Sequence, residues 1–175
     1  ILRDADLQND AYQALETGAL RFPENVDILY DYAMAAEKLN RVDKMEIALR
    51  KVIKLAPTNQ HAYNALGYSL AERNLRLPEA FKLIEQALTL APNDPFILDS
   101  MGWVQYRLGK LAEAEALLRR AYALRSDTEI AVHLGEVLWV RGEKDDAQQF
   151  WRDARTKDPK NDSLKNTLTR LRVEL

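Results

Sequence analysis

The 175-residue chain contains no cysteine, only six glycines and six prolines, and 8% aromatic residues. Without cysteine it can form no disulfide framework, no thiolate metal site and no cysteine nucleophile. The few glycines and prolines exclude collagen-like and low-complexity architectures. No apolar run approaches the ~18 residues of a membrane-spanning helix. The net charge of −2 lacks the basic excess typical of nucleic-acid binding, so we expect no nucleic-acid partner.

Hydrophobic residues make up 47% of the sequence, which excludes a disordered chain and allows a sizeable core. The first residue is Ile1 rather than methionine, and no signal-like segment follows it. We therefore expect a fragment or a processed form of a longer protein. The lack of a targeting signal then carries no information, and the absence of cysteine does not identify the compartment.

Three sets of markers recur with a period near 34 residues, which indicates a repeat protein. The first set is a glycine that follows Leu or Met: Gly67, Gly102 and Gly135. The second is a proline, replaced once by serine: Pro57, Pro92, Ser126 and Pro159. The third is a mostly small residue: Met45, Ala80, Ala114 and Ala147. Because three independent markers agree, the period is a property of the whole chain.

Each period contains two stretches with the apolar spacing i, i+3, i+4 and i+7 of an amphipathic helix. The first stretches cover residues 26–39, 60–73, 95–108 and 128–141. The second stretches cover residues 43–55, 78–90, 111–124 and 144–156. Proline closes most periods, and Asn or Asp beside it can cap the next helix. The pattern predicts an all-α protein built from αα-hairpins, with no β-structure.

These residues resemble the tetratricopeptide repeat, whose pattern is W-x2-L-G-x2-Y, then A-x3-F, then P. The second copy reads Tyr63-x2-Leu66-Gly67-x2-Leu70, Ala80-x3-Ile84 and Pro92. The fourth copy reads Ala131-x2-Leu134-Gly135-x2-Leu138, Ala147-x3-Trp151 and Pro159. The resemblance covers nearly the whole chain and implies a right-handed α-solenoid.

The resemblance divides the chain, as a single solenoid over 1–175, into four repeats and two terminal helices. The repeats are 26–59, 60–94, 95–127 and 128–161. Residues 4–24 carry second-helix markers, so we predict the second helix of a repeat whose first helix is absent. Residues 162–175 carry one apolar stripe, formed by Leu164, Leu168, Leu171 and Leu175. That stripe predicts a capping helix, with a frayed tail as the alternative.

The sequence offers little catalytic chemistry, and we predict that the chain is not an enzyme and needs no cofactor or metal. It has no phosphate-binding loop, no dinucleotide-binding glycine motif and no H-E-x-x-H. Ser100 lacks the surroundings of a nucleophile elbow. His133 lies one turn from Glu129 and Glu136, but one helix cannot supply the three or four ligands of a metal site. We expect ordinary pairing of His133 on the helix surface.

A binding function is the remaining alternative to catalysis, and solenoid repeats present an extended concave surface for binding. In proteins that this chain resembles, the first helix of each repeat lines the groove. Those positions give the predicted protein-binding residues Tyr30, Met34, Asn64, Tyr68, Phe96, Asp99, Trp103, Tyr106, Arg107 and Glu136. Five of them share one face of residues 95–108, where three aromatic rings adjoin an acid and a base, the composition of an interface hot spot. The alternative is that Trp103 and Tyr106 pack on neighbouring repeats. We expect alanine at Trp103 and Arg107 to abolish partner binding and leave folding unchanged.

A narrower resemblance comes from residues 64–68, 98–103 and 133–139, which are similar to the C-terminal half of proteobacterial tetratricopeptide lipoproteins of the outer membrane. One such protein is an adaptor that activates a periplasmic carboxy-terminal-processing protease. The resemblance implies an adaptor for a partner segment, with a protease as the partner. It implies a periplasmic location, tethered to the outer membrane; the cytoplasm is the alternative. The alternative function is self-association through the flank that the half repeat leaves open.

Overall fold

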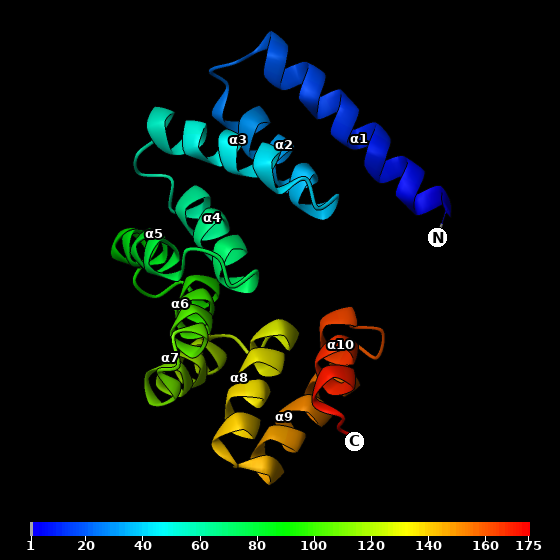
Figure 1. The fold of residues 1–175 in the computed structure, drawn as a ribbon, viewed down its shortest axis with the longest axis vertical. Coiled ribbons are helices and arrows are strands. Elements are labelled where there is room, and N and C mark those ends of the chain that lie inside the picture. Colours follow the sequence, from blue (N-terminus) through cyan, green and yellow to red (C-terminus); the bar gives the residue numbers. More distant parts are fainter. Residues whose placement is uncertain (1) are drawn as a thin grey trace. The chain divides into compact units, whose positions relative to one another are not determined.

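The computed structural model describes the backbone of residues 2–175 and the side chains from residue 7 onward. This part of the chain forms ten α-helices and no strand, so the predicted all-α class is confirmed (Figure 1). The helices are α1 (Leu2–Arg21), α2 (Val26–Lys38), α3 (Val42–Leu55), α4 (Gln60–Glu72), α5 (Leu77–Leu90), α6 (Pro95–Arg107), α7 (Leu111–Leu124), α8 (Thr128–Arg141), α9 (Lys144–Lys157) and α10 (Asp162–Leu171). Each of the eight helices predicted by range begins and ends within one residue of its predicted stretch.

Side chains from the polar breaks start several of these helices, as the sequence predicts. The carboxylate of Asp94 accepts hydrogen bonds from the backbone N–H groups of Phe96 and Ile97, and Pro95 occupies the first turn. Asn25 and Asn161 cap α2 and α10 in the same way. At the other end of α8, Gly142 has a φ of 91°, a left-handed conformation that ends the helix without strain.

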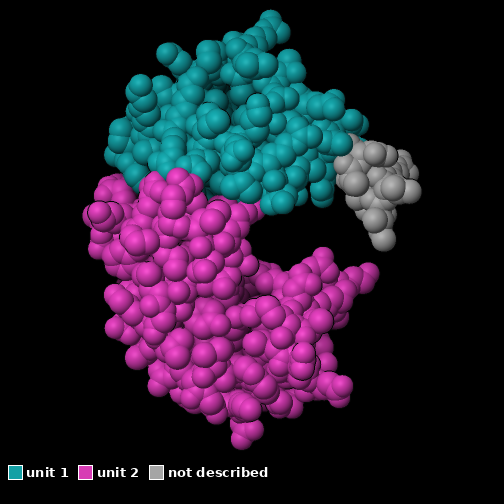
Figure 2. Space-filling model, in the orientation of Figure 1, with its two compact units in different colours: residues 1–66 teal, residues 67–175 magenta. Residues whose placement is uncertain are grey.

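The chain divides into two compact units, residues 1–66 and residues 67–175, which Figure 2 shows in teal and magenta. We call them unit 1 and unit 2 and describe each by itself. The division falls inside α4, within the predicted repeat 60–94. Unit 1 contains α1, α2, α3 and the start of α4, and unit 2 contains the rest. The predicted boundaries between repeats stay a prediction.

Close packing between the two helices of a hairpin explains the repeated glycine and alanine. A Cβ placed on Gly102 would lie 2.6 Å from Cγ of Leu118, and one on Gly135 would lie 2.4 Å from Nε1 of Trp151. Neither glycine can therefore be enlarged unless the second helix moves away. The small residues Ala114 and Ala147 are fully buried on the facing helices.

The C-terminal helix covers the end of the unit 2 core. Leu164 of α10 is buried in a cluster with Val137, Trp151 and Ala154 of the last hairpin. Leu168, Leu171 and Leu175 pack against the same cluster and are partly buried. Helix α10 ends at Leu171, four residues short of the predicted range 162–175, so Leu175 packs from outside the helix. The division that makes this segment a cap stays a prediction.

Candidate functional site

Aromatic and charged side chains of unit 2 join into one chain of contacts across α4, α6, α8 and α10. Figure 1 shows α6 and α8 on the inner side of unit 2, with α5 and α7 on its outer side. We call the contacts the first-helix network. Its members are Tyr68, Glu72, Asp99, Trp103, Tyr106, Arg107, His133, Glu136 and Arg170.

A buried ion pair lies at the centre of the network. Nδ1 of His133 donates to both carboxylate oxygens of Asp99 at 2.9 Å, and its Nε2 lies 3.4 Å from the Tyr68 hydroxyl. Burial alone would lower the pKa of His133, but the charge and the hydrogen bond of Asp99 outweigh it and raise the pKa above its ordinary value. Asp99 therefore favours the protonated form of His133 and is its counter-charge in that form.

The prediction that His133 pairs on the surface of its own helix is wrong. His133 is 5% exposed, and its partners belong to α4 and α6 instead of Glu129 and Glu136 of α8. The reason is that α8 packs on α6 along the face that carries His133, which places the imidazole opposite Asp99.

Trp103 joins this pair to α4. Its indole ring stacks on His133 with centroids 4.2 Å apart, and its Nε1–H donates to Glu72 at 2.7 Å. The guanidinium of Arg107 lies 5.1 Å from the centroid of the Trp103 ring and donates to the backbone carbonyl of Glu72 at 2.8 Å. The indole thus contacts an imidazole and a guanidinium and donates its N–H to a carboxylate, and Trp103 is only 3% exposed.

The network continues from α6 to the C-terminal helix through a second buried acid. Glu136 is 1% exposed and accepts hydrogen bonds from the Tyr106 hydroxyl at 2.9 Å and from Arg170 at 2.6 Å. Burial, together with the negative charge of Glu136, raises the pKa of Tyr106 to about 12. Tyr106 therefore stays a neutral donor at physiological pH, and Arg170 balances the charge of Glu136.

The structure brings six of the predicted binding residues together in the first-helix network. These are Tyr68, Asp99, Trp103, Tyr106, Arg107 and Glu136. Phe96 also lies in unit 2 but outside the network; it is 44% exposed and contacts Arg125 through its ring face. Tyr30, Met34 and Asn64 are half-buried residues of unit 1. The role of these residues in binding stays a prediction.

Burial separates the predicted residues into two groups with different uses. Asp99, Trp103 and Glu136 are buried and hold neighbouring helices together. The packing of Trp103 on a neighbouring repeat is the alternative that the sequence left open. Its replacement by alanine would remove packing as well as any partner contact, so a test of binding needs Phe96 and Tyr106 instead.

The partners of His133 and Arg170 were not among the sequence predictions, although a signal for both was present. His133 lies 34 residues after Asp99, and Arg170 lies 34 residues after Glu136. One period of the repeat separates each pair, so their members occupy matching places on successive layers. A search for opposite charges one period apart would have found both pairs.

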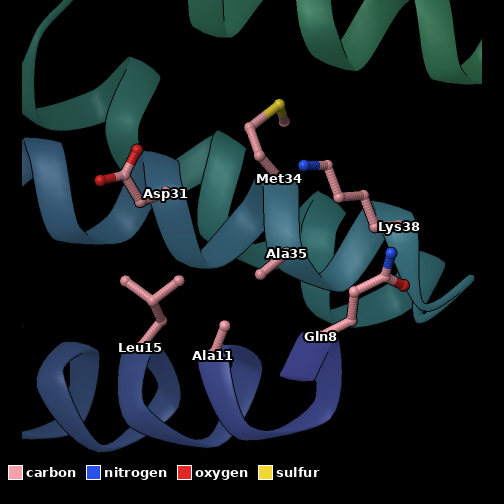
Figure 3. A pocket seen from close by; sticks show the side chains of 7 residues that line it. All are labelled: Gln8, Ala11, Leu15, Asp31, Met34, Ala35 and Lys38. Atoms are coloured by element: carbon pink, nitrogen blue, oxygen red, sulfur yellow. The ribbon is translucent and has the colours of Figure 1, made fainter. Parts of the chain in front are cut away.

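Unit 1 holds a separate pocket between α1 and α2, which we call the α1–α2 pocket. It has a volume of about 300 Å³. It is lined by Gln8, Ala11, Leu15, Asp31, Met34, Ala35 and Lys38 (Figure 3). Ala11 and Leu15 point from α1 toward Ala35 of α2. The predicted binding residue Met34 belongs to this pocket.

The described residues contain no group of three or more His, Asp or Glu side chains placed to hold a metal ion. Among the same residues, no helix is both long and apolar enough to cross a membrane. Hydrogen bonds and ion pairs join most polar groups of the first-helix network across neighbouring helices, although Nε of Arg107 is buried without a hydrogen-bond partner.

Comparison with known proteins places the chain among repeat proteins. Residues 26–59 and residues 100–162 match two family models, each described as a tetratricopeptide repeat. The TPR repeat-containing protein PA4667 of Pseudomonas aeruginosa is 50% identical to the chain over 135 residues. The matched segment covers 77% of the chain and 23% of the relative, so the chain spans about a quarter of the relative's length.

Solved structures show the same fold at low sequence identity. The thermophilic TPR protein TTC0263 of Thermus thermophilus is 23% identical, with a TM-score of 0.82 over 98% of this chain and 94% of its own. MamA of Desulfovibrio magneticus is 18% identical, with a TM-score of 0.69 over 89% of this chain and 88% of its own. YrrB, a TPR protein with an unusual peptide-binding site, is 20% identical, with a TM-score of 0.64 over 93% of this chain and 86% of its own. Because the repeat models match more than half of its length, the chain belongs to the tetratricopeptide repeat family.

Proposed function

We propose that the chain is an adaptor that binds a segment of another protein on the first-helix side of unit 2. Proteins with this fold are generally non-enzymatic scaffolds for proteins and peptides. The observation that carries the proposal is the first-helix network, in which hydrogen bonds, ring stacking and ion pairs between helices hold the side chains in place. A surface ordered before binding loses less conformational entropy when the partner arrives.

The accessible groups beside this network define the chemistry of the ligand. Phe96 and Glu72 are exposed, and Tyr68 and Tyr106 are half-buried. Arg107 lies among them and is also half-buried. Apolar side chains of a segment would pack on the rings, and its polar groups would meet one acid and one base. An amphipathic segment, extended or helical, fits this mixture.

For the partner itself, we propose a periplasmic carboxy-terminal-processing protease, with the complete protein tethered to the outer membrane. Support comes from the resemblance of residues 64–68, 98–103 and 133–139 to adaptor lipoproteins of this kind. The relative from Pseudomonas aeruginosa agrees in being a TPR repeat-containing protein of much greater length. In that setting, unit 2 would hold a segment of the protease while the rest of the solenoid makes further contacts.

Affinity measurements with matched variants test the site. The double substitution Phe96→Ala and Tyr106→Ala removes one exposed ring and one half-buried ring that also donates to Glu136, and the control Leu124→Ala removes an apolar side chain that is 53% exposed on the second helix α7. We expect the double variant to bind a purified carboxy-terminal-processing protease at least about tenfold more weakly, because interface aromatics commonly contribute more than 1 kcal/mol each. The control should bind like the unmodified chain.

Two results would contradict the proposal at different levels. Absence of binding to the protease by the unmodified chain would reject this partner. Equal binding by the double variant and the control would reject the first-helix side of unit 2 as the binding surface. Circular dichroism of both variants establishes that any loss does not come from unfolding.

A further inference from the structure

The α1–α2 pocket belongs to unit 1, and its lining indicates a ligand of a different kind from the segment proposed for unit 2. Helix α1 carries the markers of a second helix, with Ala11 and Leu15 at the positions that face a first helix in the other hairpins. In those hairpins the residues that match Ala11 are fully buried: Ala80, Ala114 and Ala147. Ala11 itself is exposed and Leu15 is half-buried. Ala11 has the same residue type as these buried alanines, so its greater exposure means that no helix within residues 2–175 covers it as one covers them in the other hairpins.

The opposite wall of the pocket shows the same deficit. Ala35 of α2 is half-buried. The residues at the matching position of the later first helices are nearly or fully buried: Ser69, Val104 and Val137. Two walls on two helices are thus open at the positions that the other repeats cover. Figure 3 shows Ala11, Leu15 and Ala35 converging on this space.

The other hairpins show what fills an equivalent space. The residues that match Leu15 in α7 and α9 are Leu118 and Trp151, and each packs against a glycine of its first helix. The approach is so close that a Cβ on Gly102 would come within 2.6 Å of Leu118. The pair Ala114 and Leu118 has the same residue types as Ala11 and Leu15. A helix that presents a small residue, as α6 does with Gly102, therefore fits the pocket.

Charges on the rim favour one direction for such a helix. Asp31 and Lys38, both exposed, line the pocket at the middle and at the C-terminal end of α2 respectively. The N-terminus of a helix carries partial positive charge and the C-terminus partial negative charge. A helix running parallel to α2 would place its negative end near Lys38. This direction is antiparallel to α1, as in an αα-hairpin.

We propose that the α1–α2 pocket binds an amphipathic α-helix of the first-helix type, with a glycine or alanine at its centre and leucine or aromatic residues around it. The helix inserts its small residue against Leu15 and covers Ala11 and Ala35. This ligand is distinct from the segment proposed for unit 2, because it must present a small residue that fits closely against Leu15, whereas the segment proposed for unit 2 packs apolar side chains on aromatic rings. The pocket completes a hairpin with a helix supplied from outside residues 2–175.

Binding of a synthetic peptide to the 175-residue chain tests this site. The probe copies residues 94–108, which include the Asp94 cap and Gly102, and carries a fluorophore at its C-terminus for anisotropy. The matched probe has the substitution Gly102→Leu. We expect saturable binding of the first peptide and at least about tenfold weaker binding of the second, because the added side chain would meet Leu15.

Substitutions in the chain locate the binding. Ala11→Glu places a charge in the pocket, whereas Gln13→Glu places one on the opposite face of α1, where Gln13 is exposed. We expect Ala11→Glu to weaken peptide binding by at least about tenfold and Gln13→Glu to leave it unchanged. The variant Phe96→Ala, used for the unit 2 surface, should also leave it unchanged. The two proposals can therefore fail separately.

Three outcomes would overturn the inference. They are an absence of saturable binding, equal binding of the glycine and leucine peptides, and equal binding by the Ala11→Glu and Gln13→Glu variants. Sedimentation velocity of the chain alone adds a fourth. A dimer that dissociates in the Ala11→Glu variant would identify a second copy of this chain as the occupant in place of a first-helix peptide. Because Ala11 is exposed, circular dichroism should show that Ala11→Glu folds like the unmodified chain.

Discussion

Unit 1 and unit 2 are built from the same αα-hairpin, yet the polar contacts between their helices differ in charge and burial. In unit 1, the hydroxyl groups of Tyr12 and Tyr32 lie 3.0 Å apart, and both donate to the partly exposed carboxylate of Glu16. In unit 2, the corresponding link is the buried ion pair between His133 and Asp99. A charge that is accessible to water needs no partner, whereas a buried one does.

The units also differ in how completely their hairpins are closed. Second helices of unit 2 bury their small residues against a first helix, but α1 leaves Ala11 exposed. The burial of a side chain in a repeat therefore depends on the neighbouring helices as much as on the sequence of the repeat itself. The comparison teaches that unit 2 contains buried paired charges, whereas unit 1 contains hydroxyl contacts and an open face on α1. The α2–α3 hairpin of unit 1 is itself closed, with Met45, Leu49 and Val52 fully buried.

Removal of the buried acid should show the largest difference between the units. Asp99→Ala leaves the His133 imidazole buried without its counter-charge, and we expect the free energy of unfolding of unit 2 to fall by about 3–5 kcal/mol. Tyr32→Phe removes only a hydroxyl from unit 1 and should cost about 1 kcal/mol. Urea unfolding measures both, with circular dichroism as the probe. Similar losses in the two variants would contradict the comparison.

A matched pair of leucines should give the next largest difference. Leu118 and Leu15 occupy the same repeat position, but Leu118 is fully buried and Leu15 is half-buried beside the α1–α2 pocket. We expect Leu118→Ala to lower the free energy of unfolding by about 2–5 kcal/mol, since it leaves a cavity. Leu15→Ala should cost at most about 1 kcal/mol. An equal cost at the two positions would mean that the α1 face is already covered.

Local pattern was sufficient to predict the helices of both units. Apolar spacing, capping residues such as Asp94 and the glycine at Gly142 act within a few residues of one another, so a single sequence contains the information. The alanine and glycine markers also predicted where two helices approach closely, because only small side chains fit there. The apolar stripe of α10 was predictable for the same reason.

The depth of a side chain in the assembly was not predictable from one helix. A helical pattern identifies the face on which Trp103 lies, but its 3% exposure arises from His133 on α8 and Arg107 on the next turn of its own helix. His133 illustrates the same limit, since its partner is one period away and not one turn away. Contacts between layers can be predicted only from the repeat period, which the pattern of a single helix does not contain.

The opposite pH responses of the two units should give the smallest effect. Because its folded-state pKa is raised, His133 contributes stability that is fully present below its unfolded value of 6.5 and is lost as pH rises through the folded value. Hydrogen bonds from Tyr12 lower the pKa of Glu16, so its contribution is present above the unfolded value of 4.5 and is lost as pH falls. Unit 2 should therefore weaken toward alkaline pH and unit 1 toward acid pH.

Two measurements separate these responses. All three tryptophans lie in unit 2, so their fluorescence during urea unfolding reports on that unit, while hydrogen exchange of α1 and α2 reports on unit 1. Glu72 and Glu129 also act on His133 and strengthen its positive form. The variant His133→Gln should flatten the alkaline loss in unit 2, and Glu16→Gln should flatten the acid loss in unit 1. Loss of both responses in either variant would show that the two polar links do not act separately, since each substitution removes only one titrating group.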